Sequence, residues 1–390
     1  MTVALGPPKA FEAGEAQALF EEARRRRRRR QIWTGIVLFA SLALGAEFVF
    51  GLTTTPIPHK AVGNTWRSGG PVLPGHTGLH VDVFVQHGAY VMDLDTGRVR
   101  SAVAIPNYLG GYNNIIPRSG HVYLDLPFGV SVVLPNNLQG LRSLSIRGYP
   151  APGLQAGALV FFTGDREVKV DVRGHVLQSE NFASGSTSPV VEGRSGLVVM
   201  GGPPMRQLEL LGANGTVLRS LGYAWDTSGL FAGMAGSDRL VWIGTINPWF
   251  PNFFSPSIAV HVTDLATGAD AVIPNPPGLL PHSLAVSPHA DRVAVLWEPP
   301  VTRPSPVGPD AYLRIADITT KQVQPVPEAA GATDLLAWAP GGQWLIFGTR
   351  HPPNARGYAN GLAAYQVGTS HAHPLPLPKY AVSPAWITVW

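Results

Sequence analysis

The chain has 390 residues, no cysteine and a formal net charge of +4. Without cysteine it has no disulfides, thiolate metal sites or thiol nucleophiles, so a large core must hold the fold together. The charge arises in residues 1–30, where Lys9 and seven arginines oppose four glutamates. Residues 31–390 therefore sum to zero, and we expect no nucleic-acid partner.

A block of arginines precedes the first apolar segment. It consists of Arg24, Arg25, Arg26, Arg27, Arg28, Arg29 and Arg30. Residues 31–52 follow as an apolar run long enough to cross the roughly 30 Å hydrocarbon core of a bilayer. Because excess arginine stays on the cytoplasmic side, we expect a cytoplasmic segment 1–30, a single transmembrane helix 31–52 in the cell membrane, and an extracytoplasmic remainder.

Two alternatives remain open for this apolar run. Ala43, Gly45 and Ala46 resemble a signal-peptide cleavage site, although a leader of 30 residues is long for a signal peptide. Glu47 either reaches the outer membrane interface or makes a polar contact with a partner helix. We predict an uncleaved anchor. Arginine in place of lysine, with abundant Ala, Gly and Pro, is also typical of a GC-rich bacterial genome.

Residues 53–76 are rich in Pro, Gly and Thr without any period, which predicts a linker. From residue 77 onward, short alternating strands are separated by turn residues, and no run has a helical period. Seven related hairpins recur about 34 to 53 residues apart, which is the length of a four-stranded propeller blade. Their turns are centred on Gly97, Gly140, Gly174, Gly215, Gly268, Thr320 and Thr369. The sequence therefore predicts an all-β domain over 77–390, a seven-bladed β-propeller.

The innermost strand of a unit is clearest in two late stretches, LAVSPHADRVAVLW (284–297) and LLAWAPGGQWLIFGT (335–349). In each, a strand ends at Ser287-Pro288 or Ala339-Pro340, and the next begins at Arg292 or Gln343. These stretches resemble the repeats of WD40 and TolB-like β-propellers, whose blades carry a similar Ser-Pro-Asp-Gly turn before an apolar strand. The resemblance implies a fold and no particular activity.

The end of the chain supplies what the first unit lacks. That unit has strands for the second, third and fourth positions but no innermost strand ahead of it. The final segment, AVSPAWITVW (381–390), has the pattern of an innermost strand. We predict that it completes the first blade and removes an exposed sheet edge.

Three connections between second and third strands are enlarged and rich in Pro and aromatic residues: 247–257, 299–310 and 351–360. In neighbouring blades they would form a rim exposing Trp249, Phe250, Phe253, Phe254, Arg303, Arg356 and Tyr358. Aromatic residues with arginine are typical anchors of protein interfaces, and proline lowers the entropy cost of ordering them. The equally weighted alternative is that the loops pack on themselves and cap the ring.

The search for catalytic motifs is negative for nucleophile elbows, zinc motifs, P-loops and complete calcium loops. Asp93, Asp95 and Gly97 begin a calcium-like spacing, but a plain hairpin turn explains them better. His282 and His289 flank a predicted inner strand, His371 and His373 lie on an outer one, and a metal role for His282 with His351 is the less favoured interpretation. Five tryptophans on strands are interpreted as packing residues: Trp242, Trp297, Trp338, Trp344 and Trp386.

We therefore expect a membrane-anchored, extracytoplasmic propeller that binds or scaffolds a protein partner, with no cofactor and no metal. The alternative is an envelope enzyme, of hydrolase, lyase or quinoprotein type, with its site in the central channel. A metal-lined channel would favour the enzyme, and an adhesive aromatic rim would favour binding.

Overall fold

In the computed structural model, the chain divides into two units, Met1–Lys60 and Ala61–Trp390. The structure describes residues 73–85, 88–104, 114–118, 121–126, 130–135, 142–147, 150–155, 157–163, 166–171, 173–181, 187–201, 206–224, 231–246, 257–300, 311–350, 359–375, 377 and 386–390. The arginine block and the predicted membrane helix 31–52 lie outside these residues. In the part of the chain that is described, no helix is long and apolar enough to cross a membrane.

The described residues form antiparallel sheets and one short 3₁₀ turn, Ala213–Gly215. The first sheet contains β28 (Trp386–Val389), β1 (His80–Val85), β2 (Gly88–Asp93) and β3 (Val99–Ala104). The second contains β4 (Asn114–Arg118), β5 (His121–Leu126), β6 (Val130–Pro135) and β7 (Arg142–Arg147). The third contains β8 (Pro150–Pro152), β9 (Leu159–Thr163), β10 (Arg166–Val170) and β11 (Val176–Asn181).

An eight-stranded sheet follows, and two four-stranded sheets complete the series. The strands of the eight-stranded sheet are β12 (Thr187–Gly193), β13 (Gly196–Gly201), β14 (Gln207–Leu211), β15 (Val217–Ala224), β16 (Ala232–Ala235), β17 (Arg239–Thr245), β18 (Ala259–Asp264) and β19 (Asp270–Ile273). The next sheet contains β20 (Leu280–Val286), β21 (Arg292–Glu298), β22 (Tyr312–Asp317) and β23 (Val323–Pro325). The last contains β24 (Ala332–Trp338), β25 (Trp344–Thr349), β26 (Gly361–Gln366) and β27 (Ala372–Leu375).

The predicted hairpins join third and fourth strands, such as β2 with β3 and β18 with β19. Four of the predicted turn glycines, Gly97, Gly174, Gly215 and Gly268, have φ between 62° and 81°, a conformation that a residue with a Cβ rarely adopts. The repeat is therefore visible in the sequence because its turns need glycine. Gly140 lies outside the described residues.

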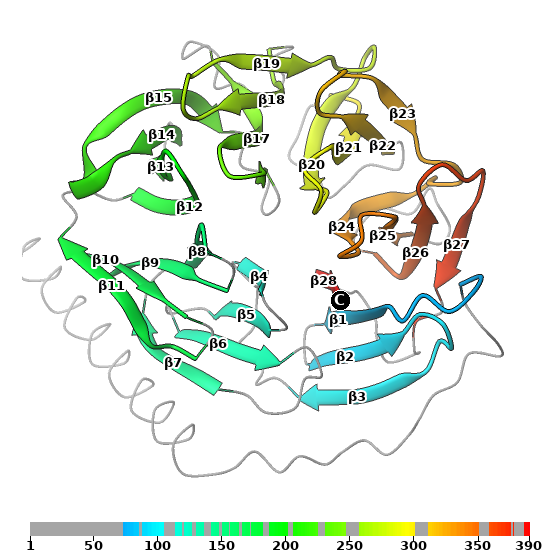
Figure 1. Cartoon of the computed structure of the whole chain (residues 1–390). Helices are drawn as coiled ribbons and strands as arrows, with labels where there is room; N and C mark the ends of the chain where they lie inside the picture. Colours follow the sequence, from blue (N-terminus) through cyan, green and yellow to red (C-terminus); the bar gives the residue numbers. More distant parts are fainter. Residues whose placement is uncertain are drawn as a thin grey trace, which may run out of the picture. The chain divides into compact units, whose positions relative to one another are not determined.

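Buried clusters join consecutive sheets face to face. One cluster links β9 and β10 to β5, another links β17 and β18 to β20 and β21, and a third links β21 and β22 to β24 and β25. Figure 1 shows the sheets following one another around a centre, with β12, β20, β24 and β28 among the strands nearest to it. Radially packed antiparallel sheets of this kind form a β-propeller.

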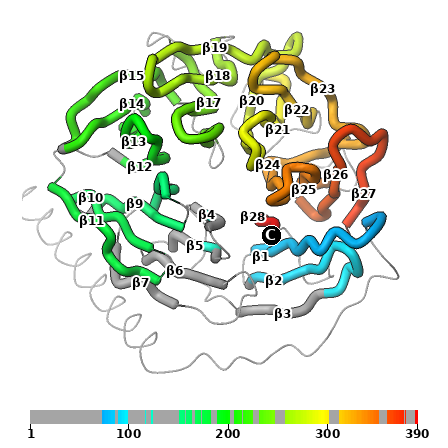
Figure 2. The backbone as a smooth tube through the Cα atoms, in the orientation of Figure 1, coloured from blue at the N-terminus to red at the C-terminus, as the bar shows by residue number. Residues whose placement is uncertain are grey.

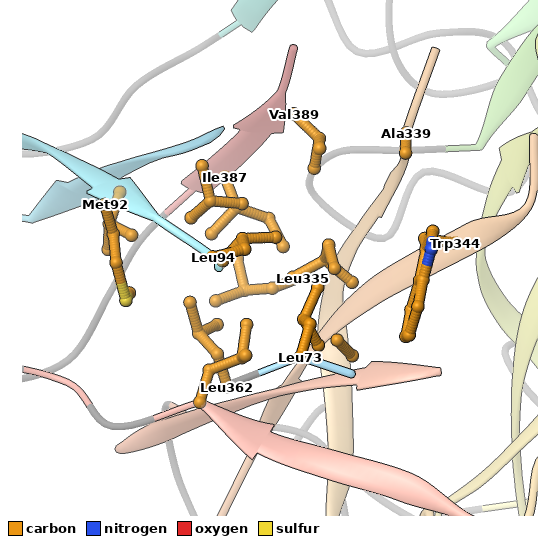
Figure 3. Close-up of a cluster of buried hydrophobic side chains, with 14 of the residues drawn as sticks. Leu73, Met92, Leu94, Leu335, Ala339, Trp344, Leu362, Ile387 and Val389 are labelled. Atoms are coloured by element: carbon orange, nitrogen blue, oxygen red, sulfur yellow. The ribbon is translucent and has the colours of Figure 1, made fainter. Parts of the chain in front are cut away.

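The ring closes where the two ends of the domain meet. The terminal strand β28 pairs antiparallel with β1, matching Val81 with Val389 and Phe84 with Trp386. In Figure 2 the last strand lies beside the first, and Figure 3 shows Ile387 and Val389 of β28 in one cluster with Leu94, Leu335 and Leu362. The predicted closure is confirmed.

Leu73 belongs to the same cluster and is 2% exposed. The sequence had placed this residue in the linker 53–76, four positions before the expected start of the domain. The packed part of the chain therefore begins no later than Leu73. The rest of the predicted linker is outside the described residues, apart from three positions that follow Leu73.

Two further predictions can be compared with the strands. The interpretation of tryptophans as packing residues is confirmed for Trp242, Trp297, Trp338 and Trp344, which are all buried. His282 was expected beside an inner strand, but it lies within β20. The strand register shifts between Pro281 and Ser283, so an irregular pairing extends β20 beyond the expected start of the strand.

Candidate functional site

The predicted rim residues lie outside the described part of the chain, but the strands that carry the three loops are described. The first loop leaves β17 after Thr245 and enters β18 at Ala259. The second leaves β21 after Glu298, and the third leaves β25 after Thr349. Each loop therefore connects the second and third strands of its group, as predicted.

The ends of β21 and β25 lie on one face of the ring. Arg350 follows β25 directly and is 1% exposed. Burial lowers the pKa of its guanidinium group, whereas the charges of Glu298 and Asp334 act in the opposite direction. Because Glu298 ends β21, this electrostatic interaction acts between the strand ends from which two neighbouring loops leave.

Four ionisable side chains form a rim-face polar layer at this place: His282, Glu298, Asp334 and Arg350. Glu298 is 4% exposed, and its Oε2 lies 3.8 Å from Nδ1 of His282. The Arg350 Nη2 donates a hydrogen bond to the carbonyl oxygen of Ala332 at 3.0 Å. The layer thus ties the starts of inner strands β20 and β24 to the ends of β21 and β25.

The sequence analysis did not find Glu298 or Arg350. Glu298 ends an apolar strand and Arg350 follows one, and a charged residue at such a position is normally interpreted as the first solvated residue of a loop. One sequence feature could have drawn attention to the end of β25: β17 and β25 share a strand ending, Gly-Thr, at Gly244–Thr245 and Gly348–Thr349. A Cβ at Gly348 would lie 2.1 Å from the Thr333 Oγ1, so the glycine permits close packing of β25 on β24.

Two exposed apolar residues mark the roots of the first two loops. Ile246 follows β17 and is 64% exposed, and Tyr312 opens β22 and is 47% exposed. These two positions place exposed apolar side chains at the ends of strands that carry the predicted aromatic loops.

A second polar cluster lies within the strands β17 to β19. Trp242 Nε1 donates to Thr263 Oγ1 at 2.9 Å, and that hydroxyl donates to Asp270 Oδ1 at 2.6 Å. His261 Nδ1 lies 2.7 Å from Asp270 Oδ2. Burial tends to raise the pKa of Asp270, but the bonds from His261 and Thr263 outweigh it and hold that pKa below its usual range.

The remaining predicted sites can be placed in part. Asp93 accepts from the backbone N–H groups of Asp95 and Thr96, so the calcium-like spacing forms the hairpin turn preferred in the sequence analysis. His371 lies 3.2 Å from Glu328, and His373 lies on β27. His351 lies outside the described residues, within which no group of three or more metal-ligating side chains occurs.

Comparisons with models of protein families and with curated proteins found no match. Solved structures do match. The WD40 domain of Pan2 from Neurospora crassa has a TM-score of 0.47 at 13% identity, covering 83% of this chain and 93% of that one. TolB from Acinetobacter baumannii has a TM-score of 0.41 at 13% identity, with 80% and 82% covered. A putative TolB from Agrobacterium tumefaciens has a TM-score of 0.39 at 9% identity, with 61% and 84% covered.

The chain resembles the WD40 and TolB-like β-propellers. At these identities the similarity concerns the fold alone, and the strand pairing described above is what establishes the propeller. The predicted resemblance is therefore confirmed at the level of architecture.

Proposed function

We propose that this chain is a single-pass, membrane-anchored bacterial protein whose extracytoplasmic, seven-bladed propeller binds another protein. Seven blades follow if the eight-stranded sheet is counted as two. Its two halves are joined by two residue pairs between β15 and β17, Tyr223 with Thr245 and Ala224 with Gly244. Neighbouring strands inside each half, such as β13 with β14 and β17 with β18, pair over more residues. The arginine block and the apolar run 31–52 support the anchor and its orientation.

The observation that carries the binding function is the origin of the three long loops in neighbouring strand groups. A binding surface made of aromatic residues and arginine gains affinity when its loops are held by a rigid base, because less entropy is lost on association. The rim-face polar layer supplies such a base under the second and third loops. Exposed Ile246 and Tyr312 supply apolar surface at the roots of the first and second loops.

Replacement of aromatic side chains in the predicted rim by alanine tests this function. Wild type and a triple variant, Trp249→Ala with Phe253→Ala and Phe254→Ala, are crosslinked in native membranes, and the captured species is identified. The matched control replaces exposed apolar residues of outer strands, Val176→Ala, Leu177→Ala and Leu218→Ala, which are 52–57% exposed. Wild type and control should capture the same protein, whereas the triple variant should lose it and melt like wild type.

Loss of stability in the triple variant, with capture retained, would instead mean that the loops cap the ring. The arginines can be tested separately. Arg303→Ala with Arg356→Ala should weaken capture most at low salt, since charges at the edge of an interface mainly affect association. Phe250 and Tyr358 complete the proposed surface, and their removal should have smaller effects of the same sign.

A further inference from the structure

A buried carboxylate lies on the seam where the ring closes. Asp82 of β1 is 0% exposed and stands opposite Thr388 of β28. The Trp390 Nε1 donates to its Oδ1 at 2.9 Å, and the Thr388 Oγ1 donates to its Oδ2 at 3.3 Å. Both donors come from the terminal segment, so one carboxyl group joins the last strand to the first.

Within its own sheet, no strand paired with β1 brings a lysine or arginine to Asp82: β1 pairs with β2 and β28, and none of these three strands contains either residue. Strand β24, which packs against β28, contains Asp334 and also no lysine or arginine. The other ionisable residues on the same face are His80 and Asp93, which oppose each other in the register. The ring of His80 lies 4.4 Å from that of Trp390, and Asp93 accepts bonds from its own turn. Tyr90 stands opposite Val83, on the other face.

A carboxylate removed from water without a cation favours its neutral form. Burial raises the pKa of Asp82 to about 7, and the hydrogen bonds from Trp390 and Thr388 lower it only in part. When β28 leaves β1, Asp82 is hydrated and its pKa returns towards 3.8. The closed ring therefore binds more protons than the open one between these two values. Closure must weaken as the pH rises through this range and level off above pH 7.

We propose that Asp82 makes closure of the ring proton-linked: neutral Asp82 keeps β28 docked, and ionised Asp82 favours its release. Release would uncover the edge of β1 and the cluster that contains Ile387 and Val389. The open ring thus exposes apolar side chains and an unpaired sheet edge, and the closed ring covers both. The proton-linked closure does not depend on the proposed binding rim.

Amide hydrogen exchange of the full-length protein tests whether closure of the ring is proton-linked. After correction for the intrinsic exchange rate, opening of residues 386–389 should rise up to about tenfold per pH unit between pH 5 and 7. Peptides from β20 to β23 should not follow this slope. The slope should vanish in Asp82→Asn, which keeps an oxygen acceptor without the charge, and should persist in the matched control Asp93→Asn. A slope that survives in Asp82→Asn, or that all sheets share, would refute the proposal.

A measurement on the wild type keeps the proposal testable if Asp82→Asn does not fold. The indole N–H resonance of Trp390, assigned from its absence in Trp390→Phe, reports the charge of its acceptor. It should shift with a midpoint near pH 7 both in wild type and in His80→Gln, which removes the neighbouring imidazole. A midpoint near pH 4, or no shift between pH 5 and 8, would overturn the proposal.

Discussion

The imidazole of His261 stacks on the indole of Trp242, with ring centroids 4.5 Å apart and planes 19° from parallel. Both side chains are buried, and Thr263 and Asp270 connect their polar atoms. The chain of bonds runs from β17 through β18 to β19. It therefore holds three strands of one group together by side chains as well as by the backbone.

Thr263→Val should destabilise the protein by about 1–3 kcal/mol, because it leaves the buried indole N–H of Trp242 without an acceptor while keeping the side-chain shape. Urea denaturation of the full chain measures this difference. Thr319→Val, at an exposed turn position, is the matched control and should change the free energy of unfolding by less than about 0.5 kcal/mol. Equal effects of the two variants would mean that the bond network contributes nothing.

The same network has a predicted acid dependence. Because the pKa of Asp270 is lowered in the folded state, its stabilising contribution is fully present above the unfolded value of about 4 and is lost as the pH falls through the folded value. Asp270→Asn should therefore be less stable than wild type at pH 7, and the difference should shrink towards pH 3. Parallel stability curves for the two proteins would contradict this assignment.

Features of the fold that depend on a few consecutive residues could be predicted from the sequence, whereas features that depend on contacts between distant segments could not. Hairpin turns such as the one at Gly268 are specified by a few consecutive residues, and β28 was recognisable from its apolar alternation. In contrast, β16 has only Ala, Gly and Met side chains and carries little pattern. The electrostatic interaction of Glu298 with Arg350 acts between two strand groups, and the sequence of either strand end does not show it.

Arg350→Met should destabilise the protein by about 1–3 kcal/mol, because it removes the buried hydrogen bond to the Ala332 carbonyl and the positive charge that acts on Glu298. Glu298→Gln alone should also destabilise. The double variant should lose less than the sum of the two, and this difference measures their coupling. Chemical denaturation of all four proteins gives the cycle, and strict additivity would mean that the two groups act independently.

Gly348→Ala should cost about 1–3 kcal/mol, since its Cβ would lie 2.1 Å from the Thr333 Oγ1 and 3.0 Å from the Leu335 Cβ. Gly341→Ala is the matched control, because nothing lies within 4 Å of its added Cβ. Thr333→Ala should partly rescue Gly348→Ala by removing the nearest atom. Thermal melting compares the variants, and an unchanged melting temperature for Gly348→Ala would show that β24 can shift without cost.

Deletion of Ser383–Trp390 should lower the melting temperature of the propeller further than any single substitution in β28 and make its unfolding less cooperative. It removes β28, uncovers the edge of β1 and takes Ile387 and Val389 out of the cluster shared by the first and last sheets. Each lost side chain alone is worth about 1.5–3 kcal/mol of burial. Ile387→Ala, which weakens the same interface but keeps the strand, should melt at a lower temperature and still cooperatively. Calorimetry distinguishes these outcomes, and an unchanged melting curve for the deletion would mean that closure of the ring contributes nothing to the stability of the domain.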